Sequence, residues 1–211
     1  MDIGSTNQNE GDMTETSEQY RTRLAKYVEG RDPVTMQREA PGTIARLIEG
    51  VGHAKLKDQP APGKWSVTEI LMHLADDELV STWRYRQMLE HETPTLAGFD
   101  QDLWARLGDY AACESEDALA MFCLLREANL RMFTHLTPEQ WRRHGVHSER
   151  GKLTVRDLCR HMAAHDVNHI DQIRSILKEN LEARVGKEQS THHNESVFPS
   201  AVRGNRGTQK R

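Results

Sequence analysis

The order of apolar and polar residues along the chain predicts helices and no strands. Apolar side chains recur at intervals of three and four residues in four long segments, which places them on one face of an α-helix. Strand signals are absent, because no segment shows sustained alternation and no Asn-Gly or Asp-Gly pair marks a hairpin turn. We therefore expect an all-α fold.

The first helical segment spans roughly residues 16–51 and is interrupted. Its early apolar face consists of Tyr20, Leu24, Tyr27 and Val28. Gly30 and Pro33 break the pattern, and Pro41-Gly42 is expected to break it a second time. The apolar spacing then resumes at Ile44, Leu47, Ile48 and Val51.

Capping signals mark where the later helices begin. Ser66, followed three residues later by Glu69, forms a capping box, so a helix is expected at about 66–90. Two further long helices are expected at 115–136 and at 154–178, the second after the cap Thr154. Between them, Thr137-Pro138-Glu139-Gln140 opens a short helix, with proline at its first position. A loop with Gly145 and Gly151 precedes the last helix. Four long amphipathic helices joined by such breakers predict a four-helix bundle.

The connection between the second and third long helices, residues 91–114, is unusually long for a bundle. It carries the aromatic residues Phe99, Trp104 and Tyr110. A loop with so many large apolar groups packs over something, either as a lid above a pocket or as an extension of the core. The sequence leaves both interpretations open.

The two ends differ in charge from the region between them. Residues 1–15 hold four acidic and no basic side chains, and residues 183–211 hold six basic and two acidic ones. Both segments are poor in large apolar residues, so we expect a disordered acidic arm, a bundle over 16–182 and a disordered basic tail. The charges of the two segments, −4 and +4, cancel, so the net charge of −4 of the whole chain falls on the bundle. A core without a clustered positive face argues against a specific nucleic-acid partner.

No apolar run approaches the length of a membrane span, and no signal peptide is evident, so we expect a cytoplasmic protein without a membrane partner. Three cysteines, Cys113, Cys123 and Cys159, are widely spaced and form no CxxC pair. We interpret them as reduced thiols rather than as disulfides or metal ligands, with Cys159 in the core.

Histidines interrupt the apolar stripe of the last long helix. His161, His165 and His169 follow one another at intervals of four residues. The stripe itself reads Val155, Leu158, Met162, His165, His169, Ile173 and Ile176. Two imidazoles therefore replace large apolar groups in the core, and His161 lies at the edge of the stripe. Burying both rings is costly unless each finds a partner, and one shared metal ion would satisfy both.

His73 lies on the second long helix beside Ile70, Asp77 and Val80, where it can project into the same interior. A single histidine on such a face is more often a hydrogen-bonded core residue than a ligand. Together with the HxxxH pair, it predicts a metal site formed by His73, His165 and His169. Three protein ligands leave one position open, which is typical of catalytic metal sites.

Three stretches of the sequence carry recognisable motifs, namely Trp65-Ser66-Val67-Thr68-Glu69 through His73 to Glu78, Leu153 to Leu158, and His165-Asp166-Val167-Asn168-His169 to Ile173. They resemble the conserved segments of the DinB-like (DinB/YfiT-like) superfamily. The resemblance covers roughly residues 20–178. It implies a four-helix bundle of up-down-down-up order in which His73, His165 and His169 bind one zinc or nickel ion. The extra histidine, His161, departs from the family pattern.

The resemblance also implies a small-molecule substrate and a range of activities. Thiol S-transfer with a low-molecular-weight thiol as cofactor is the leading expectation, ahead of a metal-dependent hydrolase or a non-catalytic metal-binding bundle. Asp77 is the candidate catalytic residue, as a base or as a group that orients an imidazole. Arg84 and Arg86 could meet an anionic substrate, although solvent-exposed arginines are the simpler interpretation. A homodimer is expected, as apolar helix faces in such bundles commonly pair.

Overall fold

The computed structural model describes residues 15–194, with side chains up to residue 178 except at positions 17 and 21. Most of the predicted acidic arm and much of the predicted basic tail lie outside the described residues, so both remain predictions. The helices are α1 (Ser17–Tyr27), α2 (Pro33–Ile48), α3 (His53–Lys57), α4 (Val67–Glu90), α5 (Gln101–Leu107), α6 (Ser115–Phe133), α7 (Pro138–Arg142) and α8 (Val155–Asn194), with a 3-10 turn, η1 (Tyr110–Ala112). The strands are β1 (Thr95–Leu96), β2 (His144–His147) and β3 (Gly151–Thr154).

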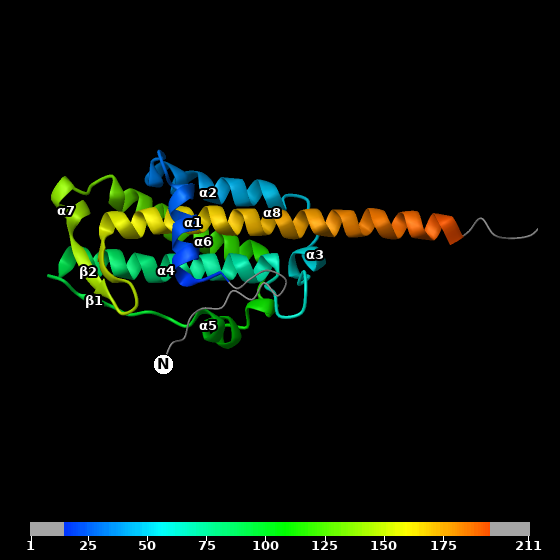
Figure 1. Ribbon diagram of the computed structural model, residues 1–211, viewed down its shortest axis with the longest axis horizontal. Coiled ribbons are helices and arrows are strands. Elements are labelled where there is room, and N and C mark those ends of the chain that lie inside the picture. The colour runs from blue at the N-terminus through cyan, green and yellow to red at the C-terminus, as the bar shows by residue number, and fades with distance from the viewer. Residues whose placement is uncertain (1–14, 195–211) are drawn as a thin grey trace, which may run out of the picture. The chain divides into compact units, whose positions relative to one another are not determined.

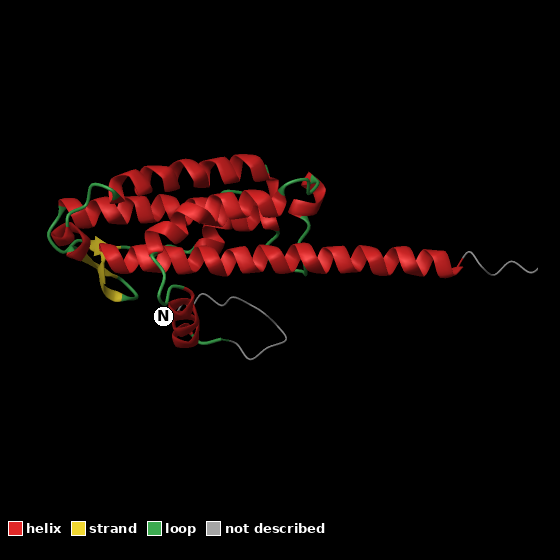
Figure 2. Ribbon diagram, turned by 90° about the horizontal axis from the view of Figure 1, so that it is seen from above, coloured by secondary structure: helices red, strands yellow, loops and turns green. Residues whose placement is uncertain are grey.

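Helices α2, α4, α6 and α8 form a four-helix bundle, which confirms the predicted fold class (Figures 1 and 2). Helices α4 and α6 run parallel: Thr68 contacts Ser115 near their starts, and the rings of Tyr85 and Phe133 stack edge to face near their ends. Helix α8 runs antiparallel to α4, because the later α4 residue Ser81 contacts the earlier α8 residue Met162. This is the up-down-down-up order that the family resemblance implied.

The core fills the space between these helices with large apolar side chains. One cluster joins α4, α6 and α8, and its members are Tyr85, Met88, Leu96, Leu130, Phe133, Val155, Leu158, Cys159 and Met162. The expected position of Cys159 in the core is thereby confirmed. The three cysteines carry free thiols. No helix in the described part of the chain is long and apolar enough to cross a membrane.

Local side-chain caps begin the helices where the sequence predicted. Ser66 and Glu69 form a reciprocal capping box at the start of α4, and Thr137 and Gln140 form another at α7. The Thr154 hydroxyl accepts a hydrogen bond from the backbone amide of Asp157 at 3.0 Å, which caps the first turn of α8. These caps fix where α4 and α8 start, and therefore the height of each histidine in the bundle.

The predicted break at Pro41-Gly42 is wrong, because α2 continues through Pro41 to Ile48. A proline inside a helix cannot donate to the carbonyl four residues earlier. Here that carbonyl belongs to Gln37, and the Arg126 guanidinium of α6 donates to it at 2.9 Å. The unpaired acceptor that normally makes an internal proline costly is thus satisfied from a neighbouring helix.

The expectation that no strands form is also wrong, because β1, β2 and β3 make a small sheet at one end of the bundle (Figure 1). Strand β1 pairs parallel with β2, and β2 pairs antiparallel with β3. A Cβ at Gly145 would lie 2.8 Å from Leu96 Cγ, so only glycine allows β1 to approach β2 this closely. Strands of two to four residues are too short to show alternation in the sequence.

The connection over residues 91–114 contains β1, α5 and η1 rather than an irregular loop. Leu96 and Tyr110 are buried, which favours the core-extension interpretation for these two residues. The Tyr110 hydroxyl donates to the Asp76 carboxylate of α4. Phe99 and Trp104 stack against each other, with their ring centroids 4.8 Å apart.

Candidate metal centre

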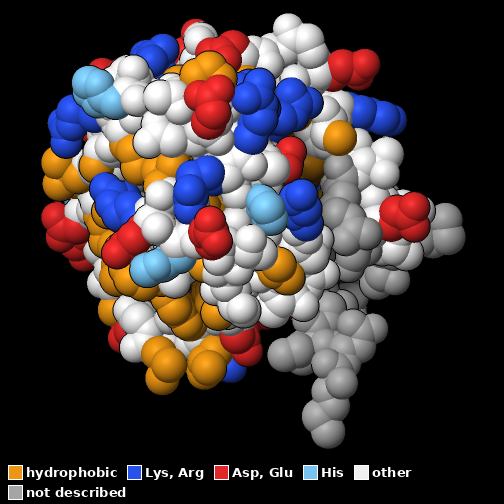
Figure 3. All heavy atoms as spheres, turned by 90° about the vertical axis from the view of Figure 1, so that its left-hand side faces the viewer, with side chains coloured by type: hydrophobic (Ala, Val, Ile, Leu, Met, Phe, Trp, Pro, Cys, Tyr) orange, Lys and Arg blue, Asp and Glu red, His pale blue; other side chains and the backbone are white. Residues whose placement is uncertain are grey.

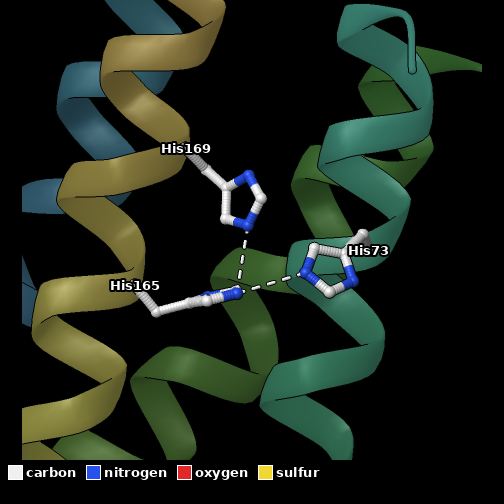
Figure 4. A group of neighbouring side chains, drawn as sticks. All are labelled: His73, His165 and His169. Atoms are coloured by element: carbon white, nitrogen blue, oxygen red, sulfur yellow. Dashed lines mark hydrogen bonds between the residues drawn. The ribbon is translucent and has the colours of Figure 1, made fainter. Parts of the chain in front are cut away.

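His73, His165 and His169 project from two helices towards one point in the bundle. His73 comes from α4, and the other two come from successive turns of α8 (Figure 4). The Nε2 atoms of His73 and His165 lie 3.2 Å apart, and those of His165 and His169 lie 3.0 Å apart. All three rings are buried, with 2%, 5% and 5% of their residue surfaces exposed.

This spacing fits a shared cation. A tetrahedral ion with bonds of about 2.0 to 2.1 Å to nitrogen holds its ligand atoms about 3.3 Å from one another. The His165 Nε2 atom faces two other Nε2 atoms, and each such nitrogen of a neutral ring carries either one proton or one lone pair. Hydrogen bonds among the three rings alone therefore cannot use all of their lone pairs. A cation at the centre accepts the lone pairs of all three rings at once. The donor set and its geometry therefore fit a divalent metal ion.

The three imidazoles are held in the neutral state that metal ligation requires. Burial lowers the pKa of His73 and of His165, and it lowers the pKa of His169 to about 3. The neighbouring histidines add to the shift at His165 and His169, because charging one ring opposes charging the next.

Neighbouring side chains orient two of these rings. The Nδ1 atom of His169 lies 2.9 Å from the Gln172 side-chain oxygen, which can accept a hydrogen bond from it. This bond places the proton on Nδ1 and leaves the Nε2 lone pair directed at the other histidines. The Trp65 ring packs against the His73 ring with centroids 4.9 Å apart, and it limits the rotation of that imidazole. Neither Gln172 nor Trp65 was assigned a role from the sequence.

Asp77 lies beside the three histidines, as its spacing of one turn from His73 suggested. Its carboxylate oxygen is 3.2 Å from His165 Nε2 and 3.9 Å from His73 Nε2. Its side chain is 15% exposed, so it keeps contact with solvent. Burial raises the pKa of Asp77, and the positive charges of Arg84 and Arg150 offset this rise in part. A carboxylate in this position can hold a proton beside the metal site.

His161 lies outside the convergent group. Its ring centroid is 6.0 Å from that of His165, and its side chain is half-buried one turn earlier on α8. Burial lowers the pKa of His161 to about 3, so the ring is neutral. The three ring nitrogens that lie within 4.8 Å of one another belong to His73, His165 and His169. The geometry therefore favours the HxxxH pair chosen from the apolar stripe.

A buried ionic network next to the histidines was missed in the sequence. Arg126 of α6 donates to both carboxylate oxygens of Asp166, at 2.7 and 3.0 Å, and to Glu78 at 2.8 Å. Asn129 donates to the other oxygen of Glu78 at 2.7 Å. Asp166 directly follows His165 in the sequence, so this network holds the turn of α8 that carries the ligand. The available signal was a charged residue between Phe122 and Leu130 on the core face of α6.

The exposed position expected for Arg84 is wrong, whereas Arg86 is exposed as expected. Arg84 is 7% exposed, and its Nη2 donates to the carbonyl oxygen of Ala97 at 2.6 Å. The residue packs under β1, whose existence the sequence did not reveal.

A second group of potential ligands, His53, Glu114 and Glu116, lies on the surface. All three side chains are exposed, and the Lys57 ammonium already contacts Glu114 at 2.7 Å. This cation neutralises part of the charge that a metal ion would need. The buried histidines are therefore the better candidate.

Comparison with known proteins finds matches over the part of the chain that carries the three histidines. A family model for the DinB superfamily matches residues 36–173. The chain is 24% identical over 160 residues to "Putative metal-dependent hydrolase YfiT" of Bacillus subtilis, covering 75% of this chain and 90% of that protein. A protein of Oceanobacillus iheyensis with the same kind of name is 26% identical over 137 residues, covering 65% of this chain and 79% of that protein.

The fold has a counterpart among solved structures. YfiT from Bacillus subtilis, described as a probable metal-dependent hydrolase with an unusual four-helix bundle topology, superposes with a TM-score of 0.65. The two sequences are 22% identical, and the match covers 83% of this chain and 94% of that one. With a family match over more than half of its length and a bundle of the same kind, this chain belongs to the DinB superfamily.

Proposed function

We propose that this protein is a metal-dependent hydrolase whose divalent ion is held by His73, His165 and His169. The observation that carries the proposal is the convergence of three buried Nε2 atoms at 3.0 to 3.2 Å beside the Asp77 carboxylate. A divalent ion held by three protein ligands acts as a Lewis acid and acidifies a water or thiol bound to it. The relatives named as metal-dependent hydrolases support this reaction class.

Asp77 would accept and return the proton that the reaction moves. Its position suits this role, because its carboxylate oxygen lies 3.2 Å from His165 Nε2, within reach of a group bound between the histidines. Gln172 and Trp65 would keep two ligand rings in place. The network of Glu78, Arg126 and Asp166 would hold α4, α6 and α8 at the spacing that the site needs.

Thiol S-transfer, the leading expectation from the sequence, has less support. It needs the same three histidines, but no feature of the described residues points to a thiol in particular. The Asp77 carboxylate beside the histidines could accept a proton from a bound water or from a bound thiol, so it does not distinguish the two reactions. Thiol transfer is therefore an outcome for the experiment to separate.

Metal analysis followed by an activity screen tests the proposal. Purified protein should hold close to one zinc or nickel ion per chain, and His165→Ala should abolish it. His161→Asn is the matched control, because this histidine lies one turn earlier on the same helix, and it should retain the ion. Metal-free and reloaded protein should then be compared on chromogenic esters, amides and phosphoesters, with and without low-molecular-weight thiols.

Hydrolysis that depends on the metal and not on a thiol would support the hydrolase. Conjugation of an electrophile that requires one particular thiol would replace it with the S-transferase. Stoichiometric metal persisting in His165→Ala would show that the ligand set is wrong.

A further inference from the structure

Arg84 is a buried arginine without a partner of opposite charge. Its only hydrogen bond among the described residues is the one to Ala97, and its Nε atom is buried with no acceptor. No carboxylate in the described part of the chain forms an ion pair with it. Burying a charge without an ion-pair partner is strongly unfavourable. The side chain is therefore placed where an anion would be stabilised.

His147 of β2 lies beside Arg84 and also has an unused donor. It pairs in register with Leu96, the residue before the Ala97 carbonyl that Arg84 contacts. The His147 ring is 3% exposed, and its Nδ1 atom accepts a hydrogen bond from the Glu149 amide at 3.2 Å. The remaining nitrogen, Nε2, therefore carries the proton, and it has no acceptor in the described residues.

Burial keeps the His147 ring neutral, and the nearby positive charges of Arg84 and Arg150 add to this effect, lowering its pKa to about 4. Arg150 is exposed on the turn between β2 and β3. The negative charges that act on Arg84 are those of Asp77 on α4 and, more weakly, of Glu149 on the same turn as Arg150, and neither carboxylate forms an ion pair with Arg84. An incoming anion would thus meet donors that no formed salt bridge occupies.

These groups lie within electrostatic reach of the metal centre. Arg84 follows Asp77 by seven residues on α4, which places both on the same face about 10 Å apart along the helix. The electrostatic influence of Arg84 and Arg150 reaches His161, and that of Arg150 reaches His165 and Asp77 as well. Figure 3 shows the end of the molecule with α7 and the small sheet, where basic, acidic and histidine side chains alternate with apolar ones.

We propose that Arg84, His147 and Arg150 form an oxyanion subsite that binds the carboxylate or phosphate group of an anionic substrate. The proposal rests on the hydrolase function and names its substrate class. The free Nε–H of Arg84 and the adjacent guanidinium N–H groups match two oxygens of such a group. His147 Nε2–H adds a donor from the sheet, and Arg150 adds positive charge at the solvent side. The spacing from Asp77 means that the anion lies remote from the bond that is cleaved.

Direct binding of small anions tests the subsite without any assay of turnover. Succinate and inorganic phosphate should be titrated into metal-free and metal-loaded protein by calorimetry, and the NMR signals of Arg84 Nε and His147 Nε2 should be followed. At least one anion should bind to the metal-free and to the metal-loaded protein and should shift the signals of Arg84 Nε and His147 Nε2. The anion that binds more tightly identifies carboxylate or phosphate as the group recognised.

Arg84→Gln should weaken binding by about tenfold or more, because a charge-assisted hydrogen bond is lost. Arg86→Gln is the matched control, since Arg86 is exposed on the same helix, and it should change affinity by less than about twofold. Arg150→Gln changes an exposed turn residue, so it reports on the subsite even if Arg84→Gln fails to fold; it should weaken binding several-fold.

Three results would overturn the subsite. The first is that the wild-type protein binds neither anion. The second is that Arg84→Gln and Arg150→Gln bind the anions as tightly as wild type does. The third is binding to metal-loaded protein alone that persists in Arg84→Gln, because this would locate the anion at the metal ion. Failure of the hydrolase proposal is distinguishable, because it would appear as absent metal or absent hydrolysis while anion binding to metal-free protein persists.

Discussion

Arg126 donates a hydrogen bond to the carbonyl oxygen of Gln37, the acceptor that Pro41 leaves unpaired inside α2. The same guanidinium holds Asp166 and Glu78, so one buried side chain joins α2, α4, α6 and α8. A structural defect of one helix and the ionic network beside the metal centre are therefore connected through a single residue. This relationship makes Arg126 the most informative position for tests of stability.

Replacing Arg126 with methionine should destabilise the protein by about 3 to 5 kcal/mol, because Glu78 and Asp166 would remain buried without a cation. The free energy of unfolding from urea titration measures this change. Arg131→Met is the control, since Arg131 forms an exposed pair with Glu127 at 3.7 Å, and its effect should stay within about 0.5 kcal/mol. Similar effects for the two variants would show that the buried network contributes little.

Pro41→Ala should raise the free energy of unfolding. An alanine amide can donate to Gln37, and alanine is favoured over proline in a helix interior by about 3 kcal/mol. The gain should fall below that value, because Arg126 already satisfies the Gln37 carbonyl and proline restricts the unfolded chain. Thermal unfolding provides the measurement. A lower melting temperature would mean that the ring of Pro41 makes packing contacts worth more than the missing hydrogen bond.

The stability of the metal-free protein should fall as the pH drops below about 6.5, the pKa of histidine in an unfolded chain. Burial lowers the pKa of His161 and of His169 to about 3, so the unfolded state takes up protons first and is favoured down to that pH. Each such histidine contributes a slope of about 1.4 kcal/mol per pH unit. Asp166 and Asp77 act in the opposite sense, because burial raises the pKa of Asp166 to about 6 and also raises that of Asp77.

The histidines with a lowered pKa outnumber these two carboxylates, so the net slope should be towards lower stability in acid. These histidines are His73, His147, His161, His165 and His169. Urea titrations between pH 7 and pH 4 measure it. His169→Gln removes one titrating group and should flatten the curve, whereas a substitution of exposed His91 should leave the slope unchanged. Stability that stays constant or rises over this range would contradict the buried neutral state of the histidines.

The features predicted correctly from the sequence are those encoded within one or two turns of helix. The capping box of Ser66 and Glu69 and the HxxxH pair each depend on residues three or four apart, so a local pattern reveals them. His73 was found because a polar residue on a core face stands out. What the sequence did not reveal depends on distant partners.

Arg126 meets residues 40 to 89 positions away, and no local pattern announces such contacts. The same reason explains Arg84, whose buried position requires β1 to pack over it. Pro41 appeared to break a helix because the group that compensates for it lies on α6. Strand β1 has two residues and pairs with β2 across a long connection, so periodicity could not identify it.

Asp77→Asn should retain the metal ion while losing about 10- to 100-fold in activity or metal affinity, as changes next to a ligand typically do. The asparagine side chain keeps the size of the aspartate but cannot accept the proton.

Because burial raises the pKa of Asp77, its charge is costly in the folded state, and the Asp77→Asn variant should be at least as stable as wild type without metal. Metal content, turnover and melting temperature should therefore change independently, which distinguishes this variant from the ligand variant His165→Ala. Asp171→Asn, at an exposed position of α8 two residues after His169, is the control for loss of a nearby carboxylate. If Asp77→Asn matched wild type in metal retention and turnover, the proton acceptor would have to come from the 91–114 connection. There Asp102, whose charge acts on His73, would come before Asp100, which already accepts the Leu103 amide as the cap of α5.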